Sequence, residues 1–161
     1  MLFNETFSRI LWTVGKSKTN DFHFRQPQDE FYHQHSASII GPDTFLIFDN
    51  GRTSNRIIEM KLDKKERTAY VSREYRPSSP LHVRTHGNTG LLSNGNVYGF
   101  FPSLDTQIAP SYIIEFDKRT KEEISRLELF YRIRNSSPRV YPMDTLGSET
   151  YLGFELPKEI S

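Results

Sequence analysis

Histidine is the residue type in this chain best suited to chemistry near neutral pH, because its imidazole can act there as a base, a nucleophile or a metal ligand. The sequence has five histidines, and two of them, His33 and His35, are separated by a single residue. In a β-strand this spacing places both rings on one face, an arrangement that suits a metal ion. No Asp or Glu at an obvious ligand spacing accompanies the pair, so we predict no metal.

The composition excludes several other kinds of chemistry. The chain of 161 residues has no cysteine, which removes disulfides and thiolate sites. It has neither a glycine-rich phosphate loop nor a Gly-x-Ser-x-Gly elbow, and we expect no nucleotide or other cofactor. A net charge of +1 gives no basis for binding nucleic acid through bulk charge, and no apolar run is long enough to span a membrane. The first residues also lack the pattern of a secretory signal.

A sequence repeat indicates which elements position the histidines. Residues 56–76 (RIIEMKLDKKERTAYVSREYR) and 112–132 (YIIEFDKRTKEEISRLELFYR) align without a gap, so that Tyr75-Arg76 matches Tyr131-Arg132. Upstream, each unit has a histidine (His35 or His86), an apolar pair, a turn and an apolar-aromatic run. Aromatic residues make up 13% of the chain, a composition that favours sheet. Turn residues recur too often for a helical repeat.

Each unit reads as four consecutive strands. The first strands end at Ile39-Ile40 and Leu91-Leu92, and the others cover residues 45–48, 56–62 and 69–75 in one unit and 97–101, 112–116 and 124–130 in the other. The second strands are continuously apolar, which indicates burial on both faces. Four antiparallel strands repeating at roughly 50 residues are the pattern of a β-propeller blade. We therefore predict an all-β chain with two complete four-stranded antiparallel blades packed face to face.

The same pattern predicts how the domain is divided. The blade units cover about residues 30–80 and 81–135, and partial blades flank them at 1–29 and 136–161. Residues 9–14 resemble the last strand of a preceding blade, and residues 150–156 resemble the start of a following one. Propellers close with typically four to eight blades, so we interpret residues 1–161 as part of one larger propeller. Incomplete terminal blades leave open strand edges, which predict self-association of the isolated chain.

The repeat also gives the histidines a position. His35 and His86 fall at similar places on the first strands, which line the central channel of a propeller, so both could face one funnel. The alternative is that each histidine lies at a strand end and makes only local hydrogen bonds. Asp49-Asn50-Gly51 reads as a turn after a buried strand, and Tyr75-Arg76 as a position of packing between blades.

Several motifs together resemble one enzyme family. They are Gln34-His35-Ser36-Ala37 after an aromatic segment, Asp49-Asn50-Gly51 about a dozen residues later, the strands 55–60 and 73–75, Leu92-Ser93-Asn94-Gly95-Asn96, and Trp12-Thr13-Val14-Gly15 upstream. In these residues the chain resembles the carboxy-terminal portion of the bacterial aryl-sulfate sulfotransferases. The resemblance spans most of the chain and is densest from residue 31 to 101.

The resemblance implies a fold and a reaction. The family fold is a six-bladed propeller, and the family moves a sulfuryl group from a phenolic sulfate ester to a phenol acceptor without a nucleotide donor. The resemblance implies that His35 is transiently sulfated, and we expect His86 to contact the substrate. It also implies a periplasmic or extracytoplasmic full-length protein, although the chain itself does not indicate its compartment.

The resemblance also predicts what the chain needs in order to act. The family's other catalytic His and Arg residues precede the matched motif, so we expect the isolated chain to be inactive. Its expected partners, besides the donor and the acceptor, are further copies of itself or the amino-terminal part of the propeller. The alternative function is a β-propeller binding or scaffolding module without catalysis.

Overall fold

The structure is a computed structural model that describes residues 2–3, 10–103, 110–129, 139–146 and 149–155. Its elements are β1 (Leu2–Phe3), β2 (Ile10–Trp12), β3 (His23–Phe24), the 3-10 helix η1 (Pro27–Asp29), β4 (Gln34–Gly41), β5 (Thr44–Asp49), β6 (Arg56–Asp63), β7 (Thr68–Tyr75), β8 (Asn88–Leu91), β9 (Val97–Phe101), β10 (Ser111–Phe116), β11 (Glu123–Leu129), β12 (Arg139–Leu146) and β13 (Glu149–Glu155). The described residues contain no α-helix, which confirms the all-β prediction. None of their helices is long and apolar enough to cross a membrane.

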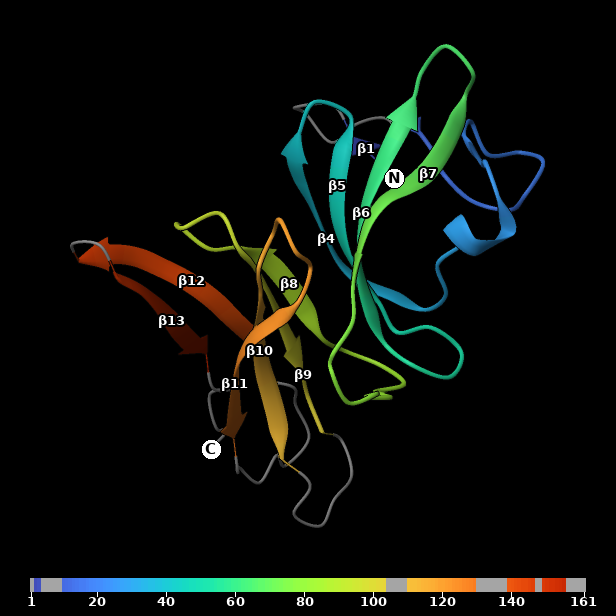
Figure 1. The fold of residues 1–161 in the computed structure, drawn as a ribbon. Coiled ribbons are helices and arrows are strands. Elements are labelled where there is room, and N and C mark those ends of the chain that lie inside the picture. Colours follow the sequence, from blue (N-terminus) through green and yellow to red (C-terminus); the bar gives the residue numbers. More distant parts are fainter. Residues whose placement is uncertain (1, 4–9, 104–109, 130–138, 147–148, 156–161) are drawn as a thin grey trace, which may run out of the picture.

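Two antiparallel meanders form the body of the molecule (Figure 1). Strands β4 to β7 lie side by side in chain order in the first sheet, and β8 to β11 do the same in the second sheet. The predicted four-strand units are therefore present, with strand limits close to those expected. Leu92 is an exception, because it lies just after β8 and its N–H donates to the carbonyl of Asn96 across the turn. Phe130 lies outside the described residues.

The first sheet has a fifth strand that the sequence did not predict. The two-residue strand β3 pairs in parallel with β7, so the expected four-stranded antiparallel sheet is wrong for this unit. A strand of two residues is too short to show a hydrophobic period. The chain then continues along β7: the N–H of Arg25 donates to the carbonyl of Ala69 at 2.9 Å, and Asp29 Oδ1 accepts the N–H of Val71 at 2.9 Å. These contacts occupy the backbone groups of an edge strand that would otherwise be open.

The first sheet buries apolar side chains on both faces, as the apolar run of β5 predicts. Leu46 and Phe48 point toward the second sheet, whereas Phe45 and Ile47 pack on the opposite side. The core between the sheets contains Leu46, Phe48, Ile57 and Tyr75 from the first sheet and Val97, Phe101, Ile114 and Phe116 from the second. Trp12 packs on the outer face of the first sheet. The two sheets therefore pack face to face on a shared core, as predicted.

The strand register corrects the alignment of the repeat. Ile57 pairs with Tyr75 across β6 and β7, whereas Ile113 pairs with Leu127 across β10 and β11. Tyr75 is therefore equivalent to Leu127 and not to Tyr131, which lies outside the described residues. The gapless alignment fails after the third strand because the strands of the first hairpin extend further toward their turn. Strand β6 continues to Asp63, six residues beyond Ile57, whereas β10 ends at Phe116, three residues beyond Ile113.

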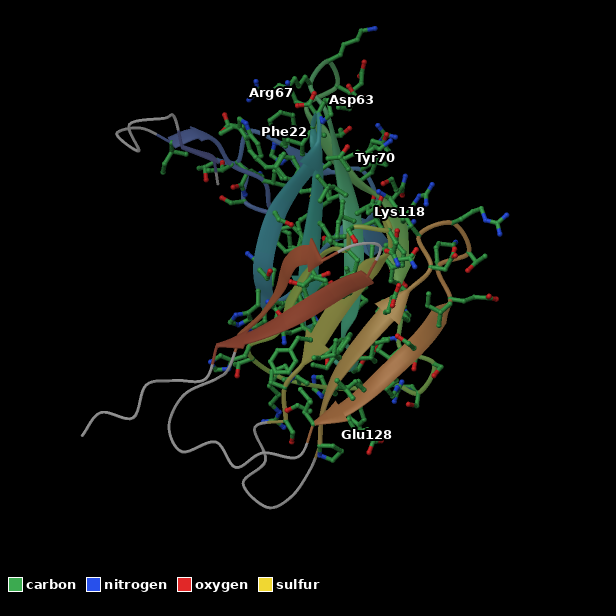
Figure 2. The ribbon with its side chains drawn as sticks, turned by 90° about the vertical axis from the view of Figure 1, so that its left-hand side faces the viewer. Phe22, Asp63, Arg67, Tyr70, Lys118 and Glu128 are labelled. Atoms are coloured by element: carbon green, nitrogen blue, oxygen red, sulfur yellow. The ribbon has the colours of Figure 1, made fainter. Side chains whose placement is uncertain are left out.

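The turns between the third and fourth strands have the charged character that the sequence predicts. Asp63 Oδ1 accepts the N–H groups of Lys65 and Glu66, and Asp117 Oδ1 accepts those of Arg119 and Thr120. Asp63 lies at one end of the molecule, and Glu128 on β11 lies toward the other (Figure 2). The same carboxylate–amide turn thus recurs in both units, as expected of a structural repeat.

The flanking segments form small sheets of their own. Strand β2 lies within the predicted segment 9–14 and pairs with β1, and β13 covers most of the predicted segment 150–156 and pairs with β12. Strand β12 lies beside β8 (Figures 1 and 2). That these segments belong to neighbouring blades stays a prediction.

Candidate functional site

The structure brings His35 and His86 together. Their rings stack with centroids 5.6 Å apart and 21° between the ring planes. His35 belongs to β4, an edge strand of the first sheet, and His86 belongs to the segment that leads into β8, the corresponding edge of the second. The His35 side chain is half-buried and that of His86 is exposed. The pair therefore lies at the junction of the two sheets.

The predicted equivalence of His35 and His86 in the repeat is wrong. His35 pairs with Phe48, and the residue in the corresponding pair of the second sheet is Asn88, opposite Phe100. His86 lies two residues before Asn88, so its counterpart is His33. Consistent with that match, His33 and His86 both have left-handed backbones, with φ of 53° and 68°. The two stacked rings thus come from different positions of the repeat.

A bulge in β4 determines where His35 points. His35 pairs with Phe48 and Ala37 with Ile47, which leaves Ser36 as an extra residue with φ of 50°. Such a bulge changes the direction of the neighbouring side chains. The Ser36 hydroxyl also accepts the N–H of Thr89 on β8 at 3.4 Å, which links the edge strands β4 and β8 beside the histidines. The irregularity is thus tied to the sheet junction.

The site concentrates backbone strain. Six non-glycine residues of the described part have positive φ, and three of them, Asp43, Arg67 and Lys121, belong to hairpin turns. The other three are His33, Ser36 and His86. Non-glycine residues in this region cost about 1–3 kcal/mol each and cluster at functional sites. Outside the turns, the strain in the described residues is confined to the histidine cluster.

His33 does not share a face of β4 with His35, contrary to the strand prediction. It precedes the first residue of β4, and its ring packs edge-on against Tyr32 with centroids 4.4 Å apart. Arg52 lies over the ring of Tyr32, with its guanidinium carbon 4.8 Å from the ring centre. Within the described residues, no three His, Asp or Glu side chains are grouped so as to hold a metal ion.

Asp49 holds the segment before His35 in place. This carboxylate is almost fully buried, and its Oδ1 accepts the N–H of Tyr32 at 2.8 Å and that of Gly51 at 3.0 Å. Its Oδ2 accepts Arg56 Nε at 2.7 Å. Gly51 has φ of 63°, and a Cβ there would lie 2.2 Å from the carbonyl oxygen of Ser54, so a side chain cannot be accommodated. The Asp-Asn-Gly motif, predicted as a turn after a buried strand, therefore also fixes the backbone that leads to His35.

Gly87 lets His86 approach the first sheet. Its φ is 105°, and a Cβ at this position would lie 2.5 Å from the ring of Phe48. The backbone next to His86 thus packs directly on an aromatic ring of the core. Thr85 Oγ1 lies 3.0 Å from His86 Nδ1, so the His86 ring is also oriented locally, as the alternative interpretation predicts. The local contact and the ring stacking exist together.

A hollow of about 730 Å³ lies beside the segment that leads to His86. Its walls come from residues 81–85, 101–103, 110 and 112. Thr85 lines it and contacts His86, although the rings of His35 and His86 are not among its walls. Phe101 and Tyr112 supply aromatic walls, and Arg84 supplies a cation. This hollow could not be predicted from the sequence, because its walls come from separate strands and loops.

Burial is the main cause of a lowered pKa at His35, and nearby positive charge on His86 and His33 lowers it further. A lowered pKa keeps the imidazole neutral, and its lone pair available, at pH values where an ordinary histidine is protonated. His35 is therefore suited to act as a nucleophile or a base in mildly acidic and neutral solution.

This shift predicts how the protein depends on pH. In the unfolded chain His35 titrates near about 6.5. Because the pKa of His35 is lower in the folded protein, the unfolded state binds more protons as the pH falls below about 6.5. The free energy of unfolding therefore decreases with falling pH until the pH is below the folded pKa as well. Above about 6.5 His35 contributes no pH dependence. We expect the His35 ring signals in an NMR titration to shift with a midpoint below about 6.5, and His86→Gln to raise that midpoint. A midpoint at or above the ordinary value would contradict this assignment.

Comparison with models of protein families identifies the family of this chain. The model of the arylsulfotransferase (ASST) family matches residues 1–125. The chain belongs to the arylsulfotransferase family. The match includes His35, His86, the Asp-Asn-Gly motif and most of both sheets. The resemblance to this family that the motifs indicated is therefore confirmed. Membership of the arylsulfotransferase family supports a sulfotransferase-type function in general terms. No curated protein and no solved structure matches the chain.

Proposed function

We propose that this protein transfers a sulfuryl group from a phenolic sulfate ester to a phenol, and that His35 carries the group between them. The observation that supports this most is the stacked pair: a half-buried imidazole with a lowered pKa lies against an exposed second imidazole, in a chain of the arylsulfotransferase family. A neutral imidazole is a good nucleophile, and a covalent intermediate divides one difficult transfer into two easier steps.

The two steps balance without a cofactor. In the first, a ring nitrogen of neutral His35 attacks the sulfur, the ester S–O bond breaks, and the aryl oxide leaves and takes up a proton. In the second, the oxygen of the acceptor phenol attacks the same sulfur, the N–S bond breaks, the phenol proton is released, and His35 is neutral again. His86 in its protonated form donates a hydrogen bond to the sulfuryl oxygens or to the leaving oxygen, where negative charge develops.

We also propose that the two sheets are successive blades of a six-bladed propeller. Their strand order, their apolar faces on both sides and the β12–β13 hairpin beside β8 support this arrangement. The blade units are then residues 30–80 and 81–135, and the histidine pair lies where two blades meet. In such a fold the inner strands β4 and β8 border the central channel, through which the phenolic donor and acceptor reach the pair.

Trapping the intermediate tests the proposed reaction. The full-length protein is mixed with 4-nitrophenyl sulfate without an acceptor, digested with trypsin at mildly alkaline pH and examined by mass spectrometry. We expect one sulfuryl group on peptide 26–52, released by mild acid because the N–S bond is acid-labile. This peptide contains His33 as well as His35, so fragmentation spectra must place the group. A sulfuryl group on another residue overturns the assignment. No labelling and no release of 4-nitrophenolate would favour the non-catalytic binding module.

A further inference from the structure

The segment that delivers His86 is attached to the first sheet, although in sequence it leads into the second. Asn50 is fully buried, and its Nδ2 donates to the carbonyl of Val83 at 2.7 Å and to the carbonyl of His86 itself at 3.0 Å. Asn50 comes directly after β5, one residue from the Asp49 carboxylate that holds the backbone before His35. One strand end therefore contacts the segments of both histidines.

A second asparagine doubles this attachment. Asn55 Nδ2 donates to the carbonyl of Val83 at 2.8 Å, and its Oδ1 accepts the N–H of Val83 at 2.6 Å. The N–H of Asn55 donates to the carbonyl of Leu81, and its Nδ2 also donates to the carbonyl of Asn50. The Asn55 amide thus binds the backbone of Asn50 as well as the 81–86 segment. Because both side chains are buried, an amide N–H left unpaired here would be costly, which strongly favours the observed arrangement.

The orientation of the Asn50 amide is determined by the 81–86 segment. Its Oδ1 is buried without a hydrogen-bond partner in the described residues, whereas its Nδ2 serves two carbonyl oxygens. Turning the amide over would place an oxygen against both carbonyls. The Asn50 side chain therefore only donates hydrogen bonds to this segment, and a carboxylate of the same shape, which has no donor, could not replace it.

We propose that Asn50 and Asn55 are the positioning residues of the site, which hold the His86 ring against His35 by binding the backbone that carries it. Asn50, Asp49 and Gly51 together then determine the spacing of the two imidazoles from a single point after β5. Neither asparagine is expected to touch the substrate. For catalysis this inference rests on the proposed function, but the geometry that it claims can be measured without any substrate.

The test follows the two rings by NMR in the full-length protein. In the variant Asn50→Ser the new side chain is uncharged and too short to reach the carbonyls of both Val83 and His86. We expect this substitution to remove the cross-peak between the His35 and His86 ring protons. We also expect it to abolish the effect of His86→Gln on the His35 titration midpoint, because the two rings are no longer adjacent. His33, the other charged neighbour of His35, is unchanged in all variants.

The matched control is Asn94→Ser. Asn94 is an exposed asparagine in the turn at the opposite end of β8, where it donates to Glu115, and its replacement should leave the cross-peak and the His86 effect intact. If Asn50→Ser fails to fold, Asn55→Ser, which removes the other tie to Val83, is expected to give the same two losses. A cross-peak and a His86 effect that persist in a folded variant overturn the inference. If both are lost as expected while wild-type protein gains no sulfuryl group, the inference stands and the proposed function fails.

Discussion

His35→Ala is expected to abolish the sulfated form of the protein entirely. The variant lacks the only atom that the proposed mechanism allows to bond with sulfur, so no slower route through the same intermediate remains. The measurement is the mass of the full-length protein after mixing with a phenolic sulfate ester without an acceptor. If His35→Ala still gains the mass of a sulfuryl group, His35 is not the nucleophile.

Two further variants make this result specific. His86→Ala should still form the intermediate, but about 10²- to 10³-fold more slowly, which is the usual effect of losing one positioned hydrogen-bond donor at a site where charge develops. His23→Ala is the matched control, because His23 is exposed on β3 at the opposite edge of the first sheet. It should form the intermediate at the wild-type rate. Equal rates for His86→Ala and the wild type would remove His86 from the mechanism.

Phe48→Ala is expected to have the largest effect on stability. The ring is fully buried between the sheets, lies with its centroid 4.9 Å from that of Phe101, and supports the backbone at Gly87. Truncating a buried phenylalanine lowers the free energy of unfolding by about 3–5 kcal/mol, since it removes contacts and leaves a cavity. Urea unfolding monitored by circular dichroism measures the change.

The control for Phe48 is an exposed aromatic residue. Tyr32 is 45% exposed, and Tyr32→Ala should change the free energy of unfolding by no more than about 0.5 kcal/mol. Phe48→Ala should also weaken the stacking of His86 on His35, because Gly87 loses the surface on which it packs. A Phe48→Ala variant as stable as Tyr32→Ala would show that the two sheets do not share the core described above.

Most strands of the two sheets could be predicted from the sequence because their signals are local. The run from Phe45 to Phe48 is apolar at every position, and burial on both faces is the physical reason. Turns such as Ser93-Asn94-Gly95-Asn96 mark where strands end, and Gly95 indeed has a φ of 85°. The parallel strand β3 gave no such signal, because its pairing depends on a distant partner, β7.

The candidate site was predicted only in part, because it depends on register and on long-range hydrogen bonds. The proximity of His35 and His86 was predicted, but His86 does not occupy the position of the repeat that the prediction gave it. An extra residue at Ser36 and turns of unequal length shift the register, and neither is visible in a gapless alignment. The roles of Asn50 and Asn55 could not be inferred, because their acceptors lie about 30 residues away. Asparagines at both ends of the short segment after a buried strand are the only hint of them in the sequence.

The ties from Asn50 and Asn55 have a mechanical consequence. In sequence, His86 belongs to the unit that contains β8, but its backbone is hydrogen-bonded to the end of β5 in the unit that contains His35. When neighbouring sheets slide slightly against each other, the 81–86 segment should therefore travel with the first sheet, and the short stretch at Gly87 should absorb the difference. The distance between the two imidazole rings would then change little when the two sheets move relative to each other. A reaction that hands one group between closely placed atoms benefits from such isolation, because its geometry does not vary with the motion of the larger fold.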